Sequence, residues 1–138
     1  MKINFFCEEV DSPKFIKSKI REIIKVISIE ENVAFSIINI IFCTDVYLLE
    51  INKQYLHHDY FTDIITFDYR NDKFVSSDIY ISIDRIQDNS QSLNISFENE
   101  LNRIIIHGIL HLSGYEDNTK NKRHNMSLKE DYYLNKIL

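Results

Sequence analysis

Apolar positions along the chain recur with two different spacings, which divide it into strands and helices. Four short segments, rich in Ile and Phe, have the alternation or continuous apolar character of strands. Five others carry apolar residues three and four positions apart or polar helix-forming sequence. The predicted strands cover residues 2–6, 33–43, 63–69 and 74–83, and the predicted helices cover 14–28, 45–55, 84–94, 96–113 and 118–137.

Local signals at the helix ends support this division. Thr44 and Ser96 stand where an N-cap side chain belongs, and Gly114 follows the long apolar helix where a helix ends. Pro13 lies near the expected first turn of the first helix, which the segment 11–13 is expected to open. The strand at 33–43 is apolar nearly throughout, so we expect it to be covered on both faces.

The element order β-α-β-α-β-β-α-α-α predicts an α+β fold. We expect one domain over residues 1–138, with a small mixed sheet of about four strands packed against five or so helices. Apolar residues make up 44% and charged residues 27%, which is ordinary for a globular domain able to fold without a metal.

Charge and cysteine content narrow the function classes. The net charge of −5 excludes a general positive field for nucleic acid, so any RNA contact must use a local patch. Cys7 and Cys43 have no metal-binding or disulfide spacing, and we expect both to be reduced and near the core. With no signal segment and no apolar run long enough for a membrane span, a cytoplasmic monomer is expected.

The segment His-Gly-Ile-Leu-His-Leu-Ser-Gly-Tyr-Glu-Asp at 107–117 carries the chemistry. His107 and His111 are four residues apart on a predicted helix, which places both imidazoles on one face. Gly114 ends the helix and allows Asp117 to return toward them. Two imidazoles and a carboxylate leave one position open on a zinc ion, as in catalytic sites. We therefore predict one Zn²⁺ per chain, bound by these three residues.

The glycine inside this helix is a further signal. Gly within a helix costs about 1 kcal/mol relative to Ala, so Gly108 indicates a close approach to the backbone, for which a substrate beside the metal is the simplest candidate. The same position argues against a zinc peptidase, because such enzymes carry a glutamate general base directly after the first histidine. A metal-activated water attacking a phosphodiester is the hydrolysis we favour.

This motif resembles that of the YbeY family of single-strand-specific metallo-endoribonucleases, H-G-x-L-H-L-x-G-Y-D-H. Asn52, Tyr55, Asp59 and the run 62–67 are similar to the family block L-N-x-x-Y-R…D…T-D-V-L-S-F, and 77–82 is similar to its strand G-D-I-x-I-S. The resemblance extends from about residue 49 to the end of the metal motif.

The resemblance implies a zinc-dependent endoribonuclease that acts in maturation of the 16S rRNA 3′ end and in ribosome quality control. Its implied partners are single-stranded RNA, rRNA and the ribosome. The chain departs from the pattern at three places: Asp117 replaces the third histidine, Leu56 replaces an arginine, and Ser77 replaces a glycine. The loss of that arginine keeps open a second hypothesis, a ribosome-assembly factor with a structural metal.

Several other residues are open to two interpretations. His124 could replace Asp117 as the third ligand, although an exposed position is expected. His57 or His58 could face the RNA phosphate from a polar loop, where a solvated histidine is the simpler interpretation. Asp78 is either a pocket residue or a hydrogen-bonding residue of its strand.

Glu100 and the basic residues also have two interpretations each. Glu100 could orient a ligand, but we favour an acidic residue of the first helical turn stabilised by the helix dipole. Two basic groups could contact RNA phosphates. The group after the metal motif is favoured over the stripe on the first helix, which we expect to be solvated. The group after the motif consists of Lys120, Lys122 and Arg123, and the stripe on the first helix consists of Lys14, Lys17, Arg21 and Lys25.

Overall fold

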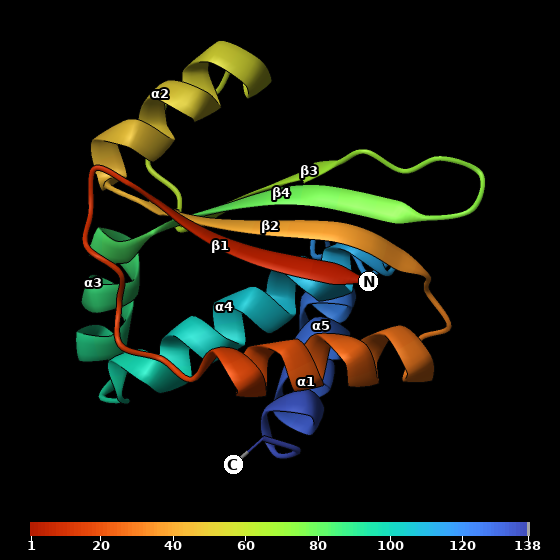
Figure 1. Ribbon diagram of the computed structural model, residues 1–138. Helices are drawn as coiled ribbons and strands as arrows, with labels where there is room; N and C mark the ends of the chain where they lie inside the picture. The colour runs from red at the N-terminus through yellow and green to blue at the C-terminus, as the bar shows by residue number, and fades with distance from the viewer. Residues whose placement is uncertain (138) are drawn as a thin grey trace.

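A four-stranded sheet with helices on both sides forms the protein, as a computed structural model of the chain shows for residues 1–137 (Figure 1). In chain order, the elements are β1 (Lys2–Glu8), α1 (Lys17–Glu30), β2 (Phe35–Cys43), α2 (Asp45–Leu56), β3 (Ile64–Asp68), β4 (Val75–Ser82), α3 (Ile83–Leu93), α4 (Phe97–Leu112) and α5 (Lys120–Leu134).

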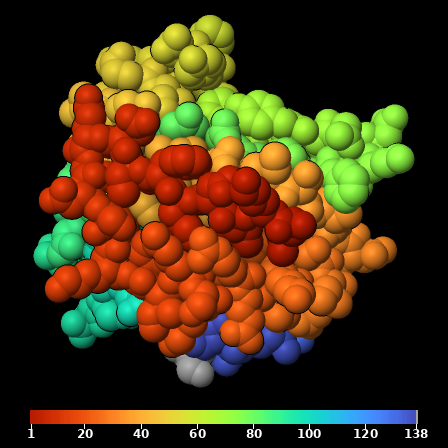
Figure 2. All heavy atoms as spheres, viewed as in Figure 1, coloured from red at the N-terminus to blue at the C-terminus, as the bar shows by residue number. Residues whose placement is uncertain are grey.

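The sheet is mixed, and its strand order is β1-β2-β4-β3. Strand β1 pairs with β2 and β2 with β4 in parallel, whereas β3 pairs antiparallel with β4 and forms an edge. Helices α1 and α4 lie along one face of the sheet, α5 packs on α4 on the same side, and α2 lies over the other face near one end (Figure 1). Helix α2 and the turn between β3 and β4 project from the body of the molecule (Figure 2). The predicted α+β fold, its element order and its mixed sheet are confirmed.

The core lies between the sheet and the helices α1, α4 and α5. Isoleucines at helical spacing on α1 meet the alternate isoleucines of β2 and β4, and most of these side chains are fully buried. Helix α4 runs through the centre of this layer and has ten buried residues, including Gly108, so it is fixed in position along its whole length. The metal motif therefore stands on the most buried helix of the fold.

The expected start of the first helix is wrong. Helix α1 begins at Lys17, after an extended Ile16 without a side-chain cap, and Pro13 lies outside it. The reason is tertiary: the ring of Phe15 packs against those of Phe5 and Phe42, with centroids 5.2 and 5.3 Å away, which holds the preceding segment out of the helix.

Strand β2 is covered on both faces only near α2. Toward its other end, Ile37 points to the open face and is 43% exposed.

Both cysteines are free, but only Cys43 is a core residue; Cys7 is exposed, contrary to expectation. Burial raises the pKa of the Cys43 thiol to about 12, so it stays protonated. Over residues 1–137, no helix combines the length and apolar character needed to cross a membrane.

Candidate metal centre

Helix α4 ends in a hydrogen-bonded bend that turns the chain back along the helix. The Gly114 amide donates to the carbonyl of His111 at 3.1 Å, and the Tyr115 amide donates to that of Leu110 at 3.0 Å. This pair of bonds is the Schellman arrangement, which needs a left-handed residue, and Gly114 supplies it with φ of +103°. The bend brings Asp117 back beside the last two turns of α4.

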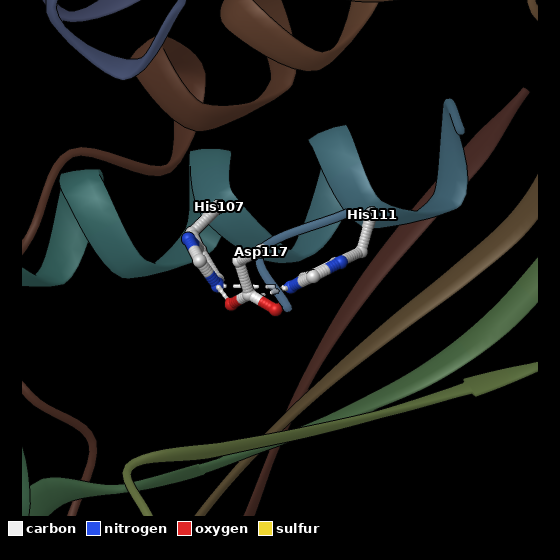
Figure 3. A group of neighbouring side chains, drawn as sticks. All are labelled: His107, His111 and Asp117. Carbon is white, nitrogen blue, oxygen red and sulfur yellow. Dashed lines mark hydrogen bonds and ion pairs between the residues drawn. The ribbon is translucent and has the colours of Figure 1, made fainter. Parts of the chain in front are cut away.

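Three potential ligand atoms converge at this bend. His107 Nε2 lies 3.0 Å from His111 Nε2, and Asp117 Oδ2 lies 3.4 Å from each of them. The imidazoles project from consecutive turns of α4 toward the Asp117 carboxylate, which comes from the loop after the helix (Figure 3). The structure thus brings together the three residues that the sequence predicted as ligands.

The second nitrogen of each imidazole is already engaged. His107 Nδ1 lies 2.7 Å from Glu130 Oε2, and His111 Nδ1 lies 2.9 Å from the Tyr115 carbonyl oxygen. A carbonyl or a carboxylate accepts, so each Nδ1 donates, and in that tautomer each Nε2 can bind a cation. The two Nε2 atoms and a carboxylate oxygen face one another, an arrangement that a cation would stabilise.

The separations fit zinc. At zinc bond lengths of about 2.0 to 2.1 Å, neighbouring ligands of a tetrahedral ion lie about 3.3 to 3.4 Å apart. The observed triangle, with sides of 3.0, 3.4 and 3.4 Å, differs from this by no more than a small side-chain adjustment. Nitrogen and carboxylate donors suit Zn²⁺, and three protein ligands leave a fourth position open.

Glu130 is a candidate site residue that the sequence analysis missed, since its carboxylate contacts His107. It lies on α5, is 7% exposed, and also pairs with Arg103 at 3.3 Å. Burial lowers the pKa of His107, but the hydrogen bond and charge of Glu130, with the charge of Asp117, raise it above its usual value. A signal was available, because Glu130 stands on the buried face of α5 between Met126 and Tyr133, where an acid is unexpected.

Gly108 packs against the sheet, and the expectation that a substrate approaches it is wrong. A Cβ at this position would lie 2.9 Å from Ile64 Cδ1 and 3.3 Å from Thr66 Oγ1. The close approach to this position is therefore made by side chains of strand β3, not by a substrate. Gly108 has no side chain, so the position after His107, where a zinc peptidase carries its glutamate base, supplies none, as the sequence indicated.

The ligands open into a cavity of about 640 Å³. Their side chains remain 21%, 31% and 43% exposed for His107, His111 and Asp117. The cavity is bounded by the metal motif, by β3 and by the segment that joins α2 to β3. The ligand atoms are therefore accessible from solvent through this cavity.

The structure distinguishes between the two interpretations of each remaining candidate residue. His124 is exposed and lies outside the ligand cluster. His58 lines the cavity, whereas His57 caps α2 in a left-handed conformation with φ of 57°. Asp78 accepts a hydrogen bond from Asn39 Nδ2 at 3.0 Å and is not among the residues lining the cavity, as its hydrogen-bonding interpretation requires.

Glu100 is a first-turn acid of α4, as expected, but it is only 3% exposed. Its Oε2 accepts from Asn89 Nδ2 at 3.3 Å, and its Oε1 has no hydrogen-bond partner among residues 1–137. Within residues 1–137 it forms no hydrogen bond with a ligand histidine, whereas Glu130 does, so Glu130 is the carboxylate that orients His107.

The two basic groups lie differently with respect to the cavity. Lys122 pairs with Glu116 at 2.6 Å, and Arg123 donates to the Asp117 carbonyl at 3.4 Å, so this group adjoins the metal loop. On α1, Lys17 and Arg21 instead lie over the ring of Phe5, away from the centre. The favoured patch is thus the one beside the candidate ligands.

Taken together, an α+β domain with two histidines on a helix and a carboxylate after a glycine bend has the architecture of a metal-dependent hydrolase. Comparison with known proteins gives the family. The model of the endoribonuclease YbeY family matches residues 3–138. Proteins with the same description from Cytophaga hutchinsonii and Karelsulcia muelleri are 42% and 49% identical, over 96% and 76% of this chain and 93% and 74% of theirs.

The fold comparison agrees. A solution structure of a Thermotoga maritima protein superposes with a TM-score of 0.67 at 27% identity, covering 98% of this chain and 88% of that one. The chain belongs to the endoribonuclease YbeY family. The resemblance drawn from the motif is confirmed, together with the metal-dependent hydrolase class that it implied.

Proposed function

We propose that this protein is a zinc-dependent endoribonuclease that cleaves single-stranded RNA during maturation of the 16S rRNA 3′ end and in ribosome quality control. The proposal places it in the cytoplasm, bound to ribosomal RNA and the ribosome. One Zn²⁺ per chain is held by His107, His111 and Asp117. Since all three ligands come from one chain, a monomer has a complete site.

The observation that carries the proposal is the convergence of His107 Nε2, His111 Nε2 and Asp117 Oδ2, with each imidazole held by a hydrogen bond from the Nδ1 on its far side. Glu130 and the Tyr115 carbonyl hold the two imidazoles with Nε2 directed at Asp117. Hydrogen bonds that fix the ligand side chains in this way raise metal affinity and keep the open coordination position directed into the cavity. When bound, the ion supplies Lewis acidity, which lowers the pKa of water and polarises a phosphodiester.

Metal content of the purified chain tests the ligand set. Asp117→Ala is expected to lose zinc, because two imidazoles alone hold it weakly, whereas Asp117→His restores a third donor and retains it. His124→Ala is the matched control: the residue is an exposed histidine in the same region, and its loss should leave metal content unchanged. Full zinc content in Asp117→Ala together with loss of zinc in His124→Ala would identify His124, and not Asp117, as the third ligand.

Cleavage tests the activity separately from the metal. Zinc-loaded protein should cleave unstructured RNA and leave duplex RNA intact, and His111→Ala should abolish cleavage. A protein with full zinc occupancy that binds ribosomal subunits but cleaves no RNA would instead be an assembly factor with a structural metal. Cleavage of casein in place of RNA would indicate a peptidase.

A further inference from the structure

The cavity at the metal centre is acidic, and this raises the question of what binds RNA there. Asp63, Asp68 and Asp117 line it, and its lining contains no lysine or arginine within residues 1–137. Arg70 is nearby, but its guanidinium already donates to the Asp68 carboxylate and, at 3.1 Å, to the Leu112 carbonyl. Among residues 1–137, the cavity lining therefore provides no lysine or arginine for an RNA backbone.

The cavity does contain a pair of stacked aromatic rings. The imidazole of His58 and the phenol ring of Tyr60 have centroids 5.1 Å apart and planes inclined by 19°. The Tyr60 hydroxyl also lies 3.0 Å from His58 Nδ1, which holds the two rings in register. Both side chains are exposed, so a face of the pair is open to a further ring.

A buried residue anchors this pair. Asn52, only 2% exposed, donates from Nδ2 to the Tyr60 carbonyl at 2.9 Å and accepts at its own carbonyl from the His58 amide at 3.1 Å. The main chain at both ring-bearing residues is therefore tied to Asn52 of α2, at Tyr60 by its side chain and at His58 by its main-chain carbonyl, although they lie in a loop. A pre-positioned exposed ring pair binds a planar ligand with little further loss of conformational entropy.

We propose that His58 and Tyr60 form a stacking platform for one unpaired nucleobase of the RNA, beside the phosphodiester at the metal centre. This inference rests on the proposed function and names the group that holds its substrate. Stacking on aromatic side chains needs no positive charge and tolerates any base sequence. It also selects single strands, since a base within a duplex is already paired and stacked on its neighbours.

The test combines changes in the protein with changes in the RNA. A short unstructured RNA is prepared with a single abasic nucleotide at each position in turn. Its dissociation constant is measured by fluorescence anisotropy on the metal-free chain, and kcat/KM is measured on the zinc-loaded chain. For the wild type, removing one particular base should weaken binding about 5- to 150-fold, the range for loss of one base–aromatic stack. For His58→Ala, removing that base should have no further effect.

Matched variants separate stacking from other roles of the imidazole. His58→Phe keeps a ring without its nitrogens and should retain the sensitivity to the abasic position. His57→Asn changes the neighbouring histidine, outside the cavity, and should behave as the wild type; asparagine tolerates its left-handed backbone. If His58→Phe binds as poorly as His58→Ala, the imidazole contacts the phosphate and the platform is refuted.

Other outcomes are equally distinct. An abasic penalty of the same size in the wild type and in His58→Ala would overturn the platform, because the base would then be bound elsewhere. Loss of that penalty in Arg70→Gln but not in His58→Ala would assign RNA binding to Arg70. If the zinc-loaded wild type cleaves no RNA, the proposed function fails, while the dissociation constants on the metal-free chain still decide whether the platform exists.

Discussion

Replacing Gly108 with alanine separates two explanations for a glycine in the middle of a helix. By helix propensity alone, the substitution would stabilise the protein by about 1 kcal/mol. The structure opposes this gain, because the new Cβ would lie 2.9 Å from Ile64 Cδ1 and 3.3 Å from Thr66 Oγ1. Overpacking of this kind costs about 1 to 3 kcal/mol. We therefore expect a net destabilisation of about 1 kcal/mol.

Urea unfolding of the metal-free chain measures this free energy, and the melting temperature should fall by about 3 to 5 °C. Ile64→Val provides the internal control, since valine lacks the Cδ1 atom that the new methyl group meets first. In that background Gly108→Ala should cost less, by about 1 kcal/mol, than in the wild type.

Two results would contradict this explanation. One is a Gly108→Ala protein that is more stable than the wild type, with the same increment in the Ile64→Val background. The other is full stability with a reduced kcat/KM, which would mean that the glycine makes room for substrate after all. Contact with β3 predicts instead that lost stability accompanies any lost activity.

Three further substitutions probe the surroundings of the centre. Glu130→Gln should weaken zinc binding about 10-fold in a chelator competition, because His107 loses a charged acceptor; unchanged affinity would exclude this orienting role. Burial raises the pKa of Glu100, so the ionised form costs stability above its unfolded pKa. Glu100→Gln should stabilise the fold by about 1 kcal/mol at pH 7 in urea unfolding. That gain should vanish near pH 4, and a gain independent of pH would refute it. Gly114→Ala, at φ of +103°, should lower stability by about 1 to 2 kcal/mol in the same assay; no loss would show that the bend tolerates a side chain.

Much of the fold was predictable because its signals are local. Thr44 and Ser96 cap α2 and α4 by accepting from the amides of Tyr47 and Asn99, each at 3.1 Å, as their places in the sequence indicated. The spacing of the isoleucines predicted which faces of the helices and strands are buried. The ligand triad was also predictable, since its members fall within eleven residues on one helix and the bend that follows it.

What could not be predicted depends on contacts between distant segments. The spacing around Gly108 shows that something approaches the helix, but only the register of β3 identifies it as Ile64. Similarly, His57 and His58 are equivalent in the sequence. A left-handed backbone at His57 ends α2, and the next residue is then the one whose ring lines the cavity.

The charges around the centre connect these separate observations. A cavity lined by three aspartates, with three acceptor atoms converging at its wall, carries excess negative charge unless a divalent cation is bound. The cation would therefore stabilise the site and also remove the main electrostatic obstacle to an RNA phosphate. Because the cavity lining has no lysine or arginine within residues 1–137, few counterions should leave the RNA on binding there. We therefore expect RNA affinity to rise when metal binds and to depend only weakly on salt. Stacking at His58 and Tyr60 supplies the part of the affinity that does not depend on charge, and the metal-free chain retains it.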